Sequence, residues 1–369
     1  MRIGLVTIYG VPNYGSVLQA YATQKIFELM GHECVLLKYD HYKAQMPKSG
    51  SRYKSVLKAM ALDYIPYLKT AKLRKFRNKY FHFSKSFNSI DDLKNNNWDD
   101  YDLFVVGSDQ VWNTNFLNGN AAFLLSFVPS GKPKHSLSSS FALKHLPEDY
   151  ISLFRKELSK FTSLSVREQN GVDIIKRDLH IGRDVKVTLD PTLLIDRTQW
   201  LTLVKSKTEP NKPYILIYLW TYAFDPRPYF ERVVEHFQKN TGYEVRVLEG
   251  HSCLGDLRVP FVDDNRSSIS EFIQLFDGAS MVITSSFHGT AFAVNFGKPL
   301  ISIVPSGESD DRQSTLLESL RLRNCIVRVG DDISKLTPYF DTDAEQVLLA
   351  NLREDSLSWI RERIINNNK

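Results

Sequence analysis

His288 stands in the stretch whose residue types most clearly suit chemistry, MVITSSFHGTAFAVNFGKPLISIV, residues 281 to 304. A predicted strand ends at Thr284, and a short apolar helix follows. The residues adjoining the histidine are Ser285, Ser286, Gly289 and Thr290. Backbone N–H groups at a helix N-terminus attract anions, and a bound phosphate favours the protonated imidazolium. The pattern predicts a phosphate site at His288, although a lone histidine is more often structural.

Two arginines are further candidates for holding an anion. Arg167 follows a predicted strand in SVREQNG, where a guanidinium could grip a carboxylate or phosphate with two parallel hydrogen bonds. An ordinary surface ion pair with Glu168 or Asp173 fits the same pattern. Arg312 comes just after another strand and loop, VPSGESDDRQ. We expect both guanidinium groups near a bound anion.

A third stretch, LFVVGSDQVWN, combines short polar side chains with an indole directly after an apolar strand. The residues concerned are Asp109, Gln110, Trp112 and Asn113. Carboxylate and amide groups bond sugar hydroxyls, and an indole stacks on a sugar face. The stretch predicts a carbohydrate site; the alternative is a capped helix start with a core tryptophan.

The turn after the first strand, YGVPNYGSVLQAYATQ, is the fourth candidate. Asn13 and Gly15 form a tight loop, and a helix is predicted from about Ser16. Free backbone N–H groups there suit an anion or a hydroxyl. No GxGxxG pattern is present, so a dinucleotide fingerprint is absent. A simple strand-to-helix turn with Ser16 as N-cap is the alternative.

These candidates follow apolar strands in an alternating strand and helix pattern. The strands read RIGLVTI, CVLLKY, LFVVG, SLSVR, KVTLD, YILIYLW, EVRVL, MVITS and PLISIV. Helical periodicity covers residues 16–30, 147–160, 228–240, 269–276 and a long C-terminal stretch, 343–365. Such alternation predicts parallel sheets covered on both faces, with ligands at the carboxyl ends of the strands. The candidate residues lie at those ends.

Length and composition exclude several classes of protein. A chain of 369 residues predicts two or three domains, and 43% apolar with 24% charged residues is typical of a globular protein. No stretch reaches the roughly 20 apolar residues of a membrane span. The start, MRIGLVTIYG, reads as a strand rather than a signal peptide. Three scattered cysteines without CxxC spacing predict neither disulfides nor a metal site, and favour the cytoplasm.

Basic residues concentrate in one segment, from Lys43 to Lys79. It holds eleven Lys or Arg residues and one acid, Asp63, within a chain of net charge +5. No nucleic-acid recognition motif accompanies it, so we expect no nucleic-acid partner. We expect this insertion to interrupt the regular strand and helix series. It is either a solvated basic helix or a surface for an anionic lipid or glycan.

The chain resembles the polysaccharide pyruvyl transferase family. The resemblance is carried by NYGSVLQAYA, VVGSDQVWN, SVREQNG, LDPTLL and SSFHGTAFAVNFGKPLI, which occur in the family's order from residue 13 to about 300. One position departs from the pattern: where many members have an arginine two residues before the motif histidine, this chain has Ser286.

The resemblance implies a GT-B-like α/β fold of two Rossmann-like domains with parallel sheets facing a central cleft. Residues 1–190 would form the acceptor side, with the basic insertion at about 43–79, and residues 191–369 the donor side with the C-terminal helix. The implied reaction transfers the enolpyruvyl group of phosphoenolpyruvate to two hydroxyls of a sugar, giving a pyruvate ketal. His288 would be the general acid, Arg167 and Arg312 would hold the donor, and neither a cofactor nor a metal is implied.

The partners implied are phosphoenolpyruvate and a sugar or lipid-linked oligosaccharide acceptor in cell-surface glycan assembly. The protein would be cytoplasmic, with a peripheral contact at the inner face of the membrane through residues 43–79 as a further expectation. Two rivals stay open: a GT-B glycosyltransferase that uses a nucleotide sugar, and a non-catalytic glycan-binding protein. A purine-stacking site with an acid that grips a ribose would favour the first.

Overall fold

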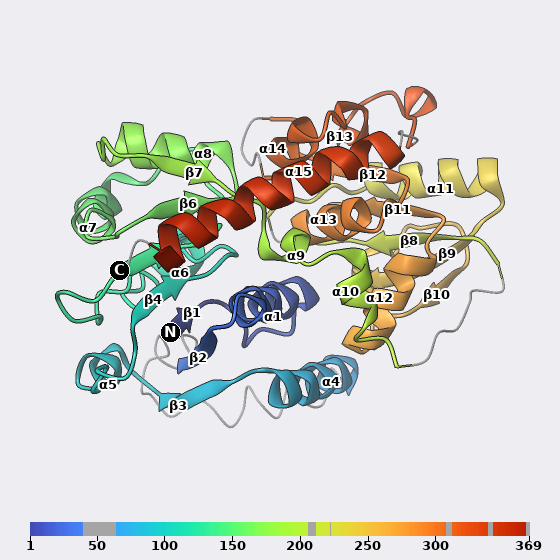
Figure 1. The fold of residues 1–369 in the computed structure, drawn as a ribbon. Helices are drawn as coiled ribbons and strands as arrows, with labels where there is room; N and C mark the ends of the chain where they lie inside the picture. The colour runs from blue at the N-terminus through green and yellow to red at the C-terminus, as the bar shows by residue number, and fades with distance from the viewer. Residues whose placement is uncertain (40–63, 206–211, 222, 308–311, 339–341, 367–369) are drawn as a thin grey trace, which may run out of the picture. The chain divides into compact units, whose positions relative to one another are not determined.

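The computed structural model describes residues 1–39, 64–205, 212–221, 223–307, 312–338 and 342–366. The chain divides into two compact units. Unit 1 comprises residues 1–194 and the chain from Glu354 onward, and unit 2 comprises residues 195–353. Each unit is built on its own parallel sheet, which confirms the predicted α/β class (Figure 1).

The main sheet of unit 1 has five parallel strands in the order β3-β2-β1-β4-β5. Their bounds are β1 (Arg2–Val6), β2 (Glu33–Tyr39), β3 (Phe83–Phe87), β4 (Leu103–Val106) and β5 (Lys134–Ser136). Parallel bridges at Ser163 and Val166 connect this sheet to a smaller parallel pair, β6 (Leu164–Val166) and β7 (Val185–Val187). The winding direction of the sheet reverses between β1 and β4, so the carboxyl ends of these strands are where an open α/β sheet binds ligands.

The described helices of unit 1 are α1 (Tyr14–Leu29), α4 (Tyr64–Tyr80), α5 (Ile90–Lys94), α6 (Thr114–Leu117), α7 (Glu148–Leu158), α8 (Gln169–Asp173) and α9 (Pro191–Leu194). A π-helical turn, Ile174–Asp178, extends α8. Helix α1 packs against β2, α4 and α9. It is buried along most of its length, including Val17, Leu18 and Phe27. Burying such side chains contributes about 1.5–3 kcal/mol each, which fixes the start of α1 on the sheet.

Helix α4 carries the described part of the basic segment; residues 40–63 lie outside the described residues. It lies in the crossover between β2 and β3 and packs against α1, with Leu73 and Phe76 buried. The Lys69 ammonium lies 4.6 Å from the Tyr14 ring centre, and Arg77 Nη1 donates to the Tyr9 carbonyl over 2.8 Å. We expected the basic segment to interrupt the regular strand and helix series. Between residues 64 and 80 it does not, because one face of α4 is part of the core.

The sheet of unit 2 has six parallel strands in the order β10-β9-β8-β11-β12-β13. Their bounds are β8 (Tyr214–Tyr218), β9 (Glu244–Glu249), β10 (Phe261–Asp263), β11 (Met281–Thr284), β12 (Leu300–Val304) and β13 (Ile326–Arg328). Every residue of β8, β11 and β12 is buried, as the continuous apolar runs predict for inner strands of a parallel sheet. This is the Rossmann strand order, with its switch point between β8 and β11.

The α-helices described in unit 2 are α10 (Arg197–Leu201), α11 (Tyr229–Thr241), α12 (Ile269–Gly278), α13 (Phe287–Asn295), α14 (Arg312–Ser319) and most of α15 (Thr342–Ile360). Short 3₁₀ turns occupy His251–Cys253, Arg323–Cys325 and Ile333–Lys335. Phe230, Val233 and Val234 of α11 join the strands in one apolar core.

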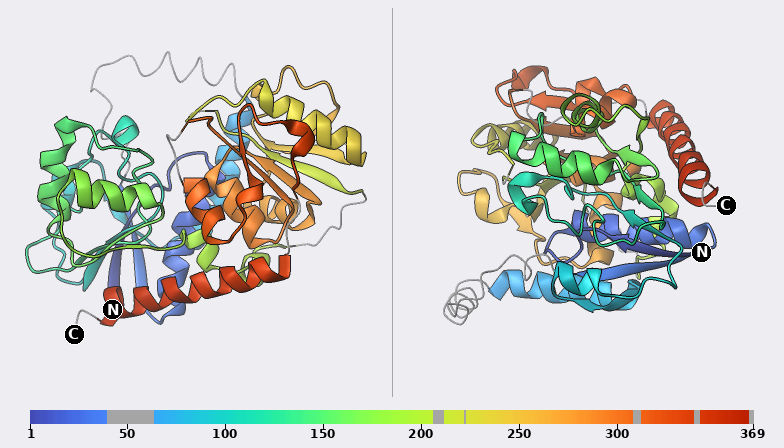
Figure 2. Two further views of the ribbon diagram at one scale, coloured as in Figure 1. Left: turned by 90° about the horizontal axis from the view of Figure 1, so that it is seen from above. Right: turned by 90° about the vertical axis from the view of Figure 1, so that its left-hand side faces the viewer.

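Figures 1 and 2 show α15 as one long helix, and a π-helical turn, Arg361–Ile365, follows it. This confirms the predicted C-terminal helix. Its last turns, from Glu354, belong to unit 1: Ser356 Oγ accepts a hydrogen bond from the Leu189 N–H over 3.1 Å, and Lys186 pairs with Asp355 over 2.8 Å. None of the described helices is both long and apolar enough to span a bilayer.

Candidate active site

His288 lies in the first turn of α13, at the carboxyl end of β11 and thus at the switch point of the unit 2 sheet. Ser286 is the N-cap, with an extended backbone, and its side chain accepts from the Gly289 N–H over 3.5 Å. A serine at this position stabilises a helix by about 1 kcal/mol. The His288 side chain is mostly buried. The structure thus places the histidine at a helix N-terminus, as the sequence predicted.

Gly289 has a steric reason to lack a side chain. A Cβ there would lie 2.8 Å from a ring carbon of Tyr218 and would clash with Thr284 Oγ1. That hydroxyl donates to the Tyr218 carbonyl over 2.6 Å and accepts from the Ser286 N–H over 3.0 Å. The start of α13 is therefore held tightly against the ends of β8 and β11, which leaves His288 little positional freedom.

The hydroxyls near His288 are used by the protein itself. Ser285 Oγ donates to the Trp220 carbonyl over 2.7 Å and accepts from the Trp220 N–H over 2.9 Å. Thr290 Oγ1 lies 2.8 Å from Ser302 Oγ, which accepts from Gln313 Nε2 over 2.8 Å. Because Thr290 is fully buried in this network, the structure does not present its hydroxyl to a ligand, which corrects the expectation.

Arg312 begins α14, and α14 packs against α13. Its side chain is mostly buried. The packing of the two helices brings the element that carries Arg312 to the element that carries His288. The neighbouring Gln313, which the sequence did not single out, is what ties α14 to Thr290 and to β12.

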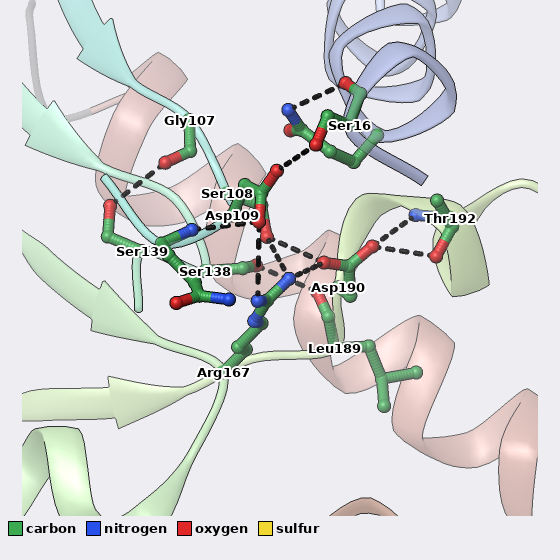
Figure 3. Close-up of polar contacts among 12 residues, drawn as sticks. Ser16, Gly107, Ser108, Asp109, Ser138, Ser139, Arg167, Leu189, Asp190 and Thr192 are labelled. Carbon is green, nitrogen blue, oxygen red and sulfur yellow. Dashed lines mark hydrogen bonds and ion pairs between the residues drawn. The ribbon is translucent and has the colours of Figure 1, made fainter. Parts of the chain in front are cut away.

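In unit 1, the turn after β1 is capped by Asn13 rather than by Ser16. The Asn13 side chain accepts from the Ser16 N–H over 3.2 Å, and the helix begins at Tyr14, so Gly15 lies in its first turn. Ser16 Oγ instead donates to Asp109 Oδ2 over 2.6 Å (Figure 3). The candidate turn after β1 and the candidate stretch after β4 therefore meet at the carboxyl ends of these two strands.

Arg167 lies in the same network. Its Nη1 donates to Asp190 Oδ2 over 2.7 Å, and its Nη2 lies 3.7 Å from Asp109 Oδ1. Asp190 also accepts from Ser108 Oγ over 2.6 Å and from Thr192 Oγ1 over 2.6 Å (Figure 3). A buried charge must be paired and hydrogen-bonded to be tolerated, and Nη1 of Arg167 meets both conditions at Asp190.

The surroundings of Arg167 differ from the expected surface ion pair. Its side chain is 1% exposed, so the ion pair is not a surface one, and the partner is Asp190 rather than Asp173. Three carboxylates, those of Asp109, Glu168 and Asp190, lie within 4 Å of the guanidinium. The positive charge is therefore enclosed, and its closest partner is Asp190. A donor-binding role for Arg167 stays a prediction.

The Trp112 indole has no open face for a sugar. It is 1% exposed, packs against the rings of Phe141 and Phe161, and its Nε1 donates to the Phe123 carbonyl over 3.1 Å. The predicted stacking role is thus wrong in this structure, and the alternative of a core tryptophan holds.

Gln110 and Asn113 are engaged with each other. Asn113 Nδ2 donates to Gln110 Oε1 over 2.7 Å, and Asn113 Oδ1 caps α6 by accepting from the Asn115 N–H over 3.0 Å. Both side chains are buried. They shape the loop after β4 that carries Asp109, instead of presenting amides to solvent.

Sequence reasoning did not single out two residues of this network, Asp190 and Thr192. Both stand in LDPTLL, a stretch used above only for its resemblance. The signal for Asp190 was an acid directly after a predicted strand and before Pro-Thr, the same placement that singled out Asp109. Within the described part of the chain, no group of three or more His, Cys, Asp or Glu side chains is arranged to hold a metal ion.

Comparison with known proteins agrees with this architecture. One similar structure is that of a Listeria monocytogenes protein whose proposed identity is UDP-N-acetylglucosamine 2-epimerase. Its TM-score is 0.52 at 12% identity, over 99% of this chain and 97% of that one. A glycosyltransferase from Rickettsia africae ESF-5 has a TM-score of 0.49 at 12% identity, over 99% of each chain. At such identity the Listeria structure shows the fold alone, which is GT-B-like. No curated protein matches the sequence.

The sequence model of the family described as polysaccharide pyruvyl transferase matches residues 13–307. The match begins at Asn13, the cap of α1, and ends beyond β12. It therefore includes both the Arg167 network of unit 1 and the His288 turn of unit 2. The chain belongs to the polysaccharide pyruvyl transferase family.

Proposed function

We propose that this transferase moves the enolpyruvyl group of phosphoenolpyruvate onto two hydroxyls of a sugar and releases phosphate, in the biosynthesis of cell-surface glycans. The observation that carries the proposal is the placement of His288. A histidine in the first turn of a helix, at the switch point of a doubly wound sheet, combines an acid with an anion-attracting helix end. Family membership over residues 13–307 supports the same reaction.

The reaction needs a proton at the methylene carbon of the enol. In our proposal His288 delivers it, which makes the neighbouring carbon electrophilic, and a sugar hydroxyl attacks that carbon. Departure of phosphate then lets a second hydroxyl attack and close the ketal. General acid catalysis of this kind contributes typically about 10²–10⁴-fold.

The donor brings a phosphate and a carboxylate, and unit 2 supplies partners for them. The N-terminal N–H groups of α13 carry partial positive charge, and Arg312 lies on the helix packed beside it. Ser286, where many members have arginine, contributes an N-cap instead of a charge. We therefore assign donor binding to unit 2, through α13 and Arg312, and acceptor binding to unit 1.

A donor screen tests the proposal. Purified protein is incubated with phosphoenolpyruvate or with nucleotide sugars, and with methyl galactoside, methyl glucoside or methyl N-acetylmannosaminide as acceptor. We expect phosphate release from phosphoenolpyruvate that depends on the sugar, and a ketal in the product by NMR. Nucleotide release would instead support a glycosyltransferase. Sugar binding without release of either would support a glycan-binding protein and overturn the proposal.

A further inference from the structure

Three polar side chains join three elements within unit 2. Thr290 belongs to α13, Ser302 to β12 and Gln313 to α14 (Figure 1). Thr290 Oγ1 lies 2.8 Å from Ser302 Oγ, and Gln313 Nε2 donates to Ser302 Oγ over 2.8 Å. The same amide nitrogen reaches Thr290 Oγ1 and the Ile303 carbonyl, each over 3.5 Å. We call Thr290, Ser302 and Gln313 the buried polar cluster of unit 2.

Stability alone does not account for polar residues at these places. Ser302 is the middle residue of β12, and the other residues of this buried strand are leucine, isoleucine and valine. Ser302 and Thr290 are 0% exposed, and Gln313 is 4% exposed. Burying a polar side chain is unfavourable unless it is hydrogen-bonded, and the net gain is then small. A fully bonded cluster does, however, fix one arrangement of the elements that it joins.

The cluster adjoins both of the unit 2 side chains that the proposed function uses. Gln313 directly follows Arg312 in the first turn of α14, and Thr290 comes two residues after His288 in the first turn of α13. Neighbouring positions of a helix point about 100° apart, and positions two residues apart point about 200° apart. Gln313 and Thr290 therefore anchor both helices to β12, while Arg312 and His288 leave the same two turns in other directions.

We propose that Gln313 is a positioning residue of the donor site, an inference that rests on the proposed function. Its amide holds the first turn of α14 against α13 and β12, and so fixes where the Arg312 guanidinium lies relative to His288. A guanidinium binds a phosphate through two parallel hydrogen bonds, which require a defined position as well as a charge. In this role Gln313 acts through Arg312 and does not itself contact phosphoenolpyruvate.

Gln313→Met is a clean test variant. It removes the amide and leaves an apolar side chain of similar length in a buried position. The hydroxyls of Thr290 and Ser302 still bond to each other, so neither is left without a partner. A triple variant that adds Thr290→Val and Ser302→Ala replaces the whole cluster by apolar groups of similar size, an exchange that is nearly neutral for stability.

The experiment measures the melting temperature, kcat and the KM for each substrate, with phosphoenolpyruvate and the methyl glycoside that wild type uses best. We expect Gln313→Met to lower kcat/KM for phosphoenolpyruvate by roughly 10- to 100-fold, because a displacement of about 1 Å in a positioning group has effects of this size. The KM for the sugar and the melting temperature should stay close to those of wild type. Gln238→Met, at a half-buried position of α11 in unit 2, is the matched control.

A double-mutant cycle distinguishes positioning from a purely structural role. Arg312→Gln removes the charge that Gln313 is proposed to place. In that background Gln313→Met should lower kcat/KM for phosphoenolpyruvate by less than about twofold, because no guanidinium remains to be positioned. The effects of two residues that act independently would multiply instead.

The outcomes separate this inference from the proposed function. A wild type that releases no phosphate from phosphoenolpyruvate with any of the three sugars overturns both. An active wild type whose Gln313→Met variant keeps more than a third of kcat/KM overturns the positioning role alone. A full effect of Gln313→Met in the Arg312→Gln background also overturns it. If Gln313→Met does not fold, the triple variant takes its place in the same measurements, with the same expected results.

Discussion

At the scale of single residues, His288 is the side chain on which the proposed chemistry depends most. Ser286 caps its helix, and Gly289 allows the close approach of α13 to Thr284 and Tyr218. These neighbours hold the position of the imidazole without contributing charge. Removing the imidazole should therefore affect the reaction far more than the fold.

We expect His288→Gln to lower kcat by about 10²–10⁴-fold, because glutamine keeps a polar side chain but cannot deliver the proton. The melting temperature should stay close to that of wild type. His236→Gln on α11 is the matched control, since that histidine contacts Asn240 on its own helix. Steady-state phosphate release measures the effect. Wild-type turnover in His288→Gln would remove the histidine from the mechanism.

At the scale of elements, the two faces of α4 lie in different environments. One face is packed on α1 through Leu73 and Phe76, and the other exposes Lys72, Arg74, Lys75 and Lys79. The helix contains no acid between 64 and 80. We propose that this exposed face contacts an anionic membrane.

Charge reversal of Lys72, Arg74 and Lys75 to Glu should release the protein from anionic vesicles. Each cation near such a surface contributes about 1 kcal/mol, so loss of three weakens binding by roughly a hundredfold. Co-sedimentation with phosphatidylglycerol vesicles at low and high salt measures this. Lys69 is left unchanged because it is buried against Tyr14. Equal sedimentation of wild type and variant, or none for either, would mean that the face is only solvated.

At the scale of the whole molecule, α15 contributes residues to both units, and Glu345 in it is a buried acid. Its side chain accepts one hydrogen bond, from Gln346 Nε2 over 2.8 Å, while Oε1 has no hydrogen-bond partner among the described residues. Burial raises the pKa of Glu345 from 4.5 to about 7, and the Gln346 hydrogen bond and the nearby Arg353 charge offset this rise only in part. The folded protein thus holds this proton more tightly than the unfolded chain.

Stability should therefore fall as the pH rises from about 4.5 to about 7, and the cost should be fully present above that range. Glu345→Gln removes the ionisable group, so it should raise the unfolding free energy at pH 8 by about 1–3 kcal/mol and leave it unchanged below pH 4.5. Melting temperatures measured across this range, with the exposed Glu362→Gln as control, test the sign. A variant less stable than wild type at pH 8 would contradict the assignment.

The sequence by itself determined the fold class, the positions of the inner strands and the helix that opens at His288. These follow from local patterns: continuous apolar runs predict buried parallel strands, and a cap followed by apolar periodicity predicts a helix. The ordered motifs also placed the chain in its family. Each of these signals lies within a stretch short enough to read along the chain.

Only the tertiary structure decided what the polar residues at the strand ends contact. Arg167 contacts Asp190 and Asp109, which lie 23 and 58 positions away in the sequence. The contacts form because the carboxyl ends of β4, β6 and β7 lie close together in unit 1. Trp112 and Lys69 likewise became core contacts through elements distant in sequence. A side chain's burial and charge partners depend on the packing of such distant segments, and no local pattern carries that information.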